Sequence, residues 1–128
     1  MIYFDTSALV KLVFEEAESA ALTEWLTSKV DVPKVSSELS TIELVRTCRR
    51  LDEDAVADAN LLLAGIDLLP MDRAIIETAA ALLPVELRSL DAIHLASALS
   101  VRPAAFVAYD ARLCSAALKA GIEVVSPA

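Results

Sequence analysis

Three aspartates stand at the edges of apolar segments in this sequence. Asp5 ends the apolar start of IYFDTSALV, Asp91 lies in LRSLDAIHLASAL at 87–99, and Asp110 lies in FVAYDARL at 106–113. A half-buried carboxylate is costly unless a partner compensates its charge. Several acids that converge without basic partners indicate a bound hard cation, for which Mg²⁺ and Mn²⁺ are the leading choices. The pattern therefore predicts a metal-dependent phosphoryl-transfer site.

A fourth acid is expected from the helix within SSELSTIELVRTCRR. Glu38 and Glu43 both qualify by type, and Glu43 is favoured because apolar residues surround it in the sequence. Arg46 and Arg50 follow Glu43 at i+3 and i+7, on the same helix face. That face would present one acid to a metal and two cations to phosphates. A row of surface salt bridges is the more common meaning of such a pattern taken alone.

Two of the aspartates also have a simpler structural explanation. Asp91 would lie in the first turn of a helix capped by Ser89, where a negative side chain is favourable. Asp110 would be a plain N-cap of the helix that follows it. Asp5 is harder to explain in this way because it ends a strand of buried character.

Other polar residues near these strings are assigned supporting roles. His94 is the only histidine, and the chain has no Gly-x-Ser-x-Gly elbow, so His94 is expected to pack in its helix or to support the site. Thr6 and Ser7 are expected to cap the first helix, with a hydrogen bond to an acid or a phosphate as the second interpretation. The basic residues considered as phosphate contacts are Lys11, Arg46, Arg49, Arg50, Arg73, Arg88 and Arg112.

Strands that alternate with helices predict an α/β fold with a mostly parallel sheet covered on both faces. Strands are expected at 2–4, 32–35, 66–69, 105–109 and 122–125. Helices are expected directly after Asp5 and at 17–29, from the Ser36–Ser37 caps to Arg49, and at 53–65, 72–83, 90–100 and 111–120, with Gly121 ending the last. Ligands bind such sheets beyond the carboxyl ends of the strands, where the strand order reverses. Asp5 and Asp110 would meet there if the first and fourth strands are neighbours.

Composition predicts one domain over 1–128 and restricts its setting. The chain has 128 residues, 56% of them hydrophobic, and no apolar run reaches the ~18 residues of a membrane span. Cys48 and Cys114 show no disulfide pattern, which favours a cytoplasmic location. A net charge of −8 argues against a broad basic surface for nucleic acid. A nuclease is still compatible with this net charge, since a bound metal ion would offset the negative charge of the acids in its site.

Taken together, the ordered motifs resemble the PIN-domain ribonucleases, most closely the VapC toxins of toxin–antitoxin pairs. The resemblance covers the whole chain and is carried by IYFDTSALVKL, SSELSTIELVRTCRR, SLDAIHLASAL and YDARLCSAALKAGIEVVSP. It implies a five-stranded parallel sheet of order 3-2-1-4-5. It also implies that Asp5, Glu43, Asp91 and Asp110 are the four site acids.

The resemblance further implies a Mg²⁺-dependent endoribonuclease that acts as a toxin. Asp5 and Asp91 would be the main metal ligands, with Glu43 and Asp110 completing the site directly or through water. Without metal, four neighbouring carboxylates would raise one another's pKa. The expected partners are an RNA substrate, a cognate antitoxin that places a cation in the acidic cleft, and a second copy of the chain.

The homodimer is expected to form through the N-terminal helices, because 56% hydrophobic residues is a large share for so small a surface to hide. Phe14 and Trp25 would lie in the core or on that dimer surface.

Two other functional interpretations compete with the ribonuclease. One is a PIN fold that has lost catalysis and only binds RNA or protein. The other, less favoured, is a receiver-like signalling domain, which needs a paired acidic cluster after the first strand and a late strand that ends in Lys. Here the first strand supplies only Asp5, and the late strand ends in Tyr-Asp.

Overall fold

The strands form one five-stranded parallel sheet in the centre of the molecule. The computed structural model describes residues 1–128, and the sheet has the order β3-β2-β1-β4-β5 with every neighbouring pair parallel. This confirms the α/β class and the strand order 3-2-1-4-5. The strands are β1 (Ile2–Phe4), β2 (Lys34–Ser37), β3 (Asp67–Leu69), β4 (Ala105–Val107) and β5 (Val124–Val125).

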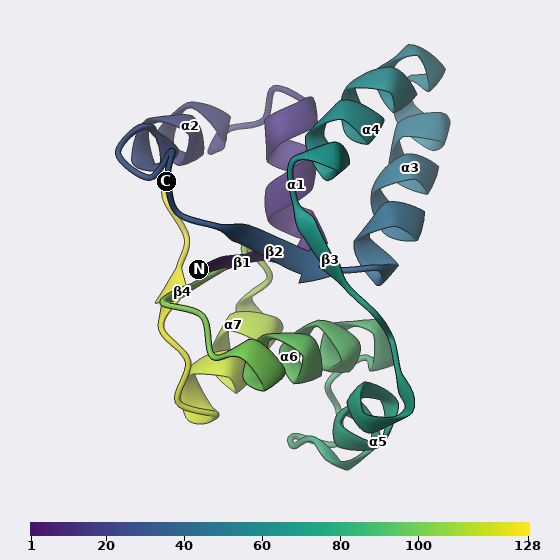
Figure 1. The fold of residues 1–128 in the computed structure, drawn as a ribbon, viewed down its shortest axis with the longest axis vertical. Helices are drawn as coiled ribbons and strands as arrows, with labels where there is room; N and C mark the ends of the chain where they lie inside the picture. The colour runs from purple at the N-terminus through teal and green to yellow at the C-terminus, as the bar shows by residue number, and fades with distance from the viewer.

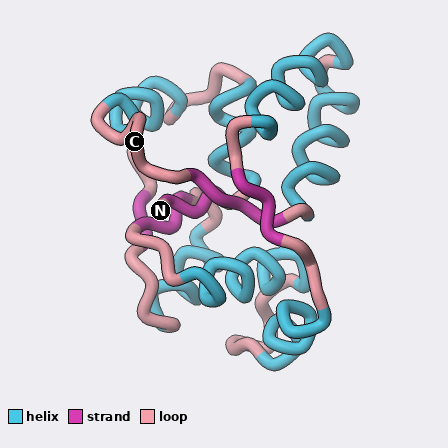
Figure 2. Tube along the Cα trace, in the orientation of Figure 1, coloured by secondary structure: helices cyan, strands magenta, loops and turns pink.

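Helices cover both faces of this sheet (Figure 1). One layer holds α1 (Thr6–Val13), α2 (Ser19–Thr27), α3 (Leu39–Leu51) and α4 (Val56–Ala64), with the short 3₁₀ helix η1 (Glu53–Ala55) before α4. The opposite layer holds α5 (Arg73–Ala81), α6 (Ser89–Val101) and α7 (Ala111–Lys119). The trace in Figure 2 shows the strands enclosed between the two layers. None of these helices has the length and apolar character needed to cross a membrane.

Each helix layer packs a separate apolar cluster against the sheet. Alternate residues of β1 point to opposite faces, so Phe4 joins the cluster under α1–α4 while Tyr3 joins the cluster under α6 and α7. Burying a large apolar side chain contributes about 1.5–3 kcal/mol to folding. Phe14 and Trp25 pack against the first cluster, which favours the core over the dimer surface for them.

Strand β2 begins two residues later than expected and takes in both serines. Pro33 has no N–H to donate to a sheet, and its carbonyl instead accepts the N–H of Ile2 at 2.9 Å. Ser36 lies in the strand, where its hydroxyl donates to the carbonyl of Phe4 at 2.6 Å. Ser37 ends the strand and still accepts the N–H of Leu39 at 3.1 Å, so the expected caps became strand residues that also support α3.

The last two strands are shorter than expected because neighbouring groups take their N–H donors. Ile122 donates to the carbonyl of Ala117 and Gly121 to that of Leu118, both at 3.0 Å, which closes the C-terminus of α7 in a Schellman motif. Gly121 has φ 86°, the left-handed conformation predicted for the residue that ends this helix. Strand β4 ends at Val107, and the N–H of Tyr109 binds the Ser7 hydroxyl instead of a strand.

Helix starts agree with the sequence at Asp110 and differ at Ser89. The Asp110 side chain accepts the N–H of Leu113 at 3.0 Å, as predicted for an N-cap. Helix α6 begins one residue earlier than expected, so Ser89 is its first residue and Arg88 is the N-cap, without a side-chain capping bond. This places Arg88 directly before the first turn of α6, which carries Asp91, and its side chain is available for other contacts.

Candidate active site

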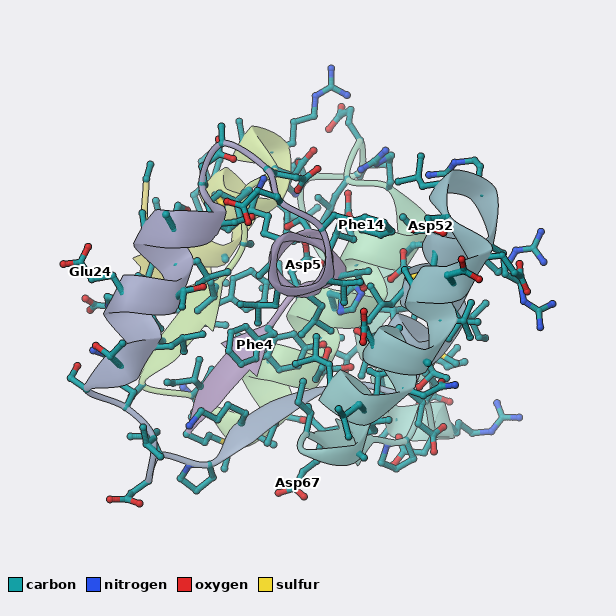
Figure 3. All side chains as sticks on the ribbon, turned by 90° about the horizontal axis from the view of Figure 1, so that it is seen from above. Phe4, Asp5, Phe14, Glu24, Asp52 and Asp67 are labelled. Carbon is teal, nitrogen blue, oxygen red and sulfur yellow. The ribbon has the colours of Figure 1, made fainter.

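Asp5 lies directly beyond the carboxyl end of β1, where the chain enters α1. Its N–H donates to the carbonyl of Val107 at 2.9 Å, which holds it beside β4, and the residue is 5% exposed. Figure 3 looks along α1 and shows Asp5 near the middle of the molecule, with Phe4 beside it. The site therefore begins at the β1–β4 edge that the topology predicted.

Ser7 fixes one oxygen of Asp5. Asp5 Oδ2 accepts the Ser7 hydroxyl at 2.6 Å and the Ser7 N–H at 3.2 Å, and the same hydroxyl accepts the N–H of Tyr109 at 3.1 Å. Asp5 itself is the N-cap of α1, so the expected capping role of Thr6 and Ser7 is wrong. Both hydroxyls hold acids instead, which was the second interpretation of these residues.

Glu43 approaches Asp5 from α3. Its Oε1 accepts the Thr6 hydroxyl at 2.8 Å and lies 2.7 Å from His94 Nε2. The same nitrogen lies 3.7 Å from Asp5 Oδ1, which makes no hydrogen bond. Thr6 and His94 thus bring an acid from the middle of the chain against the acid that ends β1.

His94 is almost completely buried between these acids and β1. It is 1% exposed, and its Nδ1 lies 2.8 Å from the Tyr3 hydroxyl. Because an ionised carboxylate only accepts hydrogen bonds, Nε2 of His94 carries a proton and donates a hydrogen bond to Glu43. His94 therefore links β1, α3 and α6, in agreement with the supporting role predicted for it.

The protonation of this pair follows from its contacts. Burial raises the pKa of Glu43, but hydrogen bonds from His94 and Thr6 and the positive charges of His94 and Arg88 outweigh it, so the net pKa lies below the usual value. Burial lowers the pKa of His94, but the hydrogen bond to Glu43 and the charges of Asp5, Glu43 and Asp91 raise it above the usual value. Glu43 thus stays ionised at neutral pH.

Asp91 and Asp110 meet at the other side of the site, with Arg88 between them. Arg88 Nε lies 3.0 Å from Asp91 Oδ2, and Arg88 Nη2 lies 3.7 Å from Asp110 Oδ2. Burial raises the pKa of Asp91; Arg88 lowers it, while the charges of Asp5 and Asp110 raise it, and the net pKa lies above the usual value. The expected rise in pKa is therefore found for Asp91, where burial is its largest cause, and is wrong for Glu43, whose hydrogen bonds and neighbouring positive charges outweigh burial.

The donor set fits a hydrated Mg²⁺ ion better than a closed cage of side chains. No three acidic, histidine or cysteine side chains lie together tightly enough to hold one ion among them. Mg²⁺ usually binds one or two carboxylates and keeps several waters. A hollow of about 200 Å³ at Glu43, Arg88, Ser89, Leu90 and Asp91 leaves room for such waters, and Asp5 Oδ1 has no competing hydrogen bond.

Of the remaining candidate phosphate contacts, three lie on α3, two pair with acids elsewhere, and Arg112 lies on α7, the helix that Asp110 caps. Arg46, Arg49 and Arg50 line a hollow of about 360 Å³ on α3, the helix that carries Glu43. Arg73 lies 3.8 Å from Glu77 on α5, and Lys11 binds Glu16 and Glu18. Only α3 therefore presents a group of arginines on the helix of a site acid.

Sequence reasoning missed two contributors to this site. Tyr3 was assigned no polar role, although strand alternation places it on the face of α6, where its hydroxyl reaches His94. Arg88 was expected to contact phosphate, whereas it binds two site acids. Its spacing of three residues before Asp91 was a signal for one of these contacts, but nothing local indicated Asp110.

Comparison with known proteins identifies the family. The family model described as PIN domain matches residues 2–119. The chain belongs to the PIN-domain family. The relative Ribonuclease VapC35 of Mycobacterium tuberculosis is 44% identical over 131 residues, which cover 99% of this chain and 97% of the relative. This PIN domain is thus similar to a VapC protein over nearly its whole length.

Two solved structures share the fold of this PIN domain. The crystal structure of Mycobacterium tuberculosis VapC20, described as a Sarcin-Ricin loop cleaving toxin, superposes with a TM-score of 0.79 at 18% identity, over 99% of this chain and 100% of that chain. A chain of a toxin–antitoxin complex from Klebsiella pneumoniae superposes with a TM-score of 0.75 at 21% identity, over 100% and 98%. At these identities the agreement concerns the fold.

Proposed function

We propose that this PIN domain is a Mg²⁺-dependent endoribonuclease that hydrolyses RNA phosphodiester bonds as the toxin of a type II toxin–antitoxin pair. The observation that carries the proposal is the convergence of Asp5, Glu43, Asp91 and Asp110 beyond the β1–β4 edge. His94 lies within 4 Å of both Asp5 and Glu43, and Arg88 lies within 4 Å of both Asp91 and Asp110. The name of the VapC35 relative supports a ribonuclease.

Asp5 and Asp91 would hold the ion, for which Mn²⁺ is the alternative to Mg²⁺. The bound ion would supply a more acidic water and would neutralise charge on the phosphoryl group. Ser7 keeps Asp5 oriented through its hydroxyl and N–H, so Oδ1 remains free. This oxygen lies 3.7 Å from His94 Nε2, the nitrogen that also contacts Glu43.

Glu43 and Asp110 complete the proposed site. Glu43 is ionised and held by two donors on Oε1, which leaves Oε2 to accept a proton from the attacking water or to bind a water. Asp110 keeps Oδ1 on the N–H of Leu113, so Oδ2 faces the site. Each acid therefore has one structural oxygen and one oxygen for chemistry.

The arginines of α3 supply a place for the RNA backbone. Arg46, Arg49 and Arg50 line one hollow on the helix that carries Glu43, and guanidinium groups bind phosphate oxygens well. Such a local group is compatible with a net charge of −8, because only the part of the RNA near the site needs neutralising. We propose that RNA enters along this face of α3.

A protein antitoxin is the proposed partner. The four acids form a site that a cationic side chain of another protein would neutralise, and the Klebsiella neighbour is described as a toxin–antitoxin complex. A silent PIN fold, which would bind RNA without cutting it, is the alternative that the experiment below tests. The receiver interpretation is set aside, since receivers have the strand order 2-1-3-4-5, unlike the order here.

Cleavage of a structured RNA with Mg²⁺, and with EDTA instead, tests the proposed function. We expect cleavage with Mg²⁺ and none with EDTA. Asp5→Asn keeps the N-cap of α1 but removes the charge, so it should abolish cleavage while the protein stays folded by circular dichroism. RNA binding without cleavage in wild type would favour the silent fold. Equal cleavage with EDTA would contradict the metal-dependent mechanism.

A further inference from the structure

Arg88 is the one arginine or lysine that pairs with the site acids. Its Nε binds Asp91 at 3.0 Å, and its Nη2 reaches toward Asp110 at 3.7 Å, so one guanidinium faces two of the four acids. Both contacts are made within a single chain. The protein therefore carries its own cation at the position where the acids require one.

The contact covers a carboxylate while Arg88 itself stays open to solvent. The side chain of Arg88 is 70% exposed, whereas that of Asp91 is 14% exposed. Arg88 is the N-cap of α6 but makes no side-chain capping bond, so its guanidinium is not needed to start the helix. An exposed side chain with no other role can leave the pair at low cost.

We infer that Arg88 is a built-in counter-ion that holds Asp91 and Asp110 in the metal-free protein and competes with the divalent cation for Asp91. The inference rests on the proposed metal-dependent function. The Asp91 oxygen bound by Arg88 is one of two through which this acid would bind an ion, and a positive charge beside the site opposes the arrival of another. With Arg88 in place, the site therefore binds the metal ion more weakly than the four acids alone would. The metal-free protein is also more stable than it would be without this arginine.

Calorimetric titration of the metal-free full chain with Mg²⁺ tests this competition. Arg88→Gln removes the charge and should bind Mg²⁺ at least about threefold more tightly than wild type at low ionic strength. The matched control is Arg73→Gln, which removes a helix arginine that lies 3.8 Å from Glu77 and makes no ion pair with the site acids. That control should stay within about twofold of wild type. The advantage of Arg88→Gln should shrink at about 0.5 M KCl, where screening is strong.

Thermal melting separates competition from a purely structural role. Without metal, Arg88→Gln should melt below wild type, because the acids lose their counter-ion. Saturating Mg²⁺ should remove that difference, since the ion then supplies the missing charge. If Arg88 only held the loop before α6, the deficit would persist with Mg²⁺. Arg88→Lys keeps the charge but cannot contact Asp91 and Asp110 through two separate nitrogens. Its Mg²⁺ affinity and its melting temperature should lie between those of Arg88→Gln and wild type.

The outcomes distinguish this inference from the proposed function. If wild type and all variants show no Mg²⁺ binding, the proposed metal dependence fails, and the competition fails with it. If wild type binds Mg²⁺ but Arg88→Gln binds it equally or more weakly, the competition alone is overturned. A melting deficit that Mg²⁺ does not repair overturns it as well.

Discussion

His94 and Thr6 are the two side chains that hold Glu43 in position. His94 Nε2 lies 2.7 Å from Glu43, and its Nδ1 lies 2.8 Å from the Tyr3 hydroxyl, so His94→Ala removes the partner of Tyr3 and one of the two donors to Glu43. We expect a loss of about 1–3 kcal/mol in unfolding free energy. His94→Gln can still donate to Glu43 and should recover part of both stability and cleavage. Equal cleavage by the Ala and Gln variants at equal folded fraction would contradict this positioning role.

Substitution of Asp91 distinguishes a catalytic role from a structural role for this acid at the start of α6. Asp91→Asn keeps the side-chain size and removes the charge. If Asp91 binds metal, RNA cleavage should fall at least about 100-fold, since losing a residue that only supports a metal ligand already costs about 10–100-fold. Unfolding free energy should change by no more than about 1 kcal/mol, the range for a charge at a helix N-terminus. Kinetics and melting of the same preparation measure both. Full activity together with a stability loss would identify Asp91 as a helix-dipole residue only.

At the scale of elements, α3 joins the site to the proposed RNA path. Replacing both Arg46 and Arg50 by Gln should weaken RNA binding, because fewer phosphates are then neutralised. The slope of log affinity against log salt should fall by about 0.7 for each single-strand phosphate that no longer meets an arginine. Arg73→Gln, from an exposed pair on α5, should leave the slope unchanged. Fluorescence anisotropy at several salt concentrations measures it, and an unchanged slope in the double variant would mean that RNA does not follow α3.

The elements also show what local sequence can predict and where it stops. The strand after residue 1, the Asp110 cap and the Gly121 helix end follow from residue types and were predicted. The start of β2 depends on Pro33, which has no N–H to donate, and the start of β5 depends on Ile122, whose N–H is already bound to the carbonyl of Ala117. The pattern of apolar residues reveals neither. Asp5, Asp91 and Asp110 could be proposed from sequence because each follows a strand or lies at a helix start, whereas Glu43, inside α3, was chosen for its apolar neighbours. Their partners could not, because Tyr3–His94 and Arg88–Asp110 join distant segments.

At the scale of the whole molecule, the homodimer stays a prediction. The apolar residues Phe14 and Trp25 of the N-terminal region pack against the core, so that region offers less free apolar surface than the composition suggested. Sedimentation equilibrium at micromolar concentration measures the mass directly. We expect a dimer, and a monomer at every concentration would contradict it. Glu24→Lys, on α2, should weaken the dimer if the N-terminal helices form the interface, whereas Glu77→Lys on α5 should not.

The metal-free molecule carries a net charge of −8, and part of that charge is concentrated in the site. A cation that binds only the folded state raises its stability, by about 2.7 kcal/mol at a hundredfold excess over Kd. We therefore expect millimolar Mg²⁺ to raise the melting temperature of wild type at pH 7, compared with EDTA.

Asp110 tests whether the four acids act together in this stabilisation. Asp110→Asn keeps an N-cap for the N–H of Leu113 but removes one negative charge, so the metal-free variant should be as stable as wild type or more stable. Its Mg²⁺-induced rise in melting temperature should be smaller. Asp110→Ala removes the cap as well and should cost about 1 kcal/mol, which isolates the capping contribution. If Asn destabilises the protein as much as Ala, and wild type shows no Mg²⁺ shift, Asp110 is a structural cap and the four-acid site is misassigned.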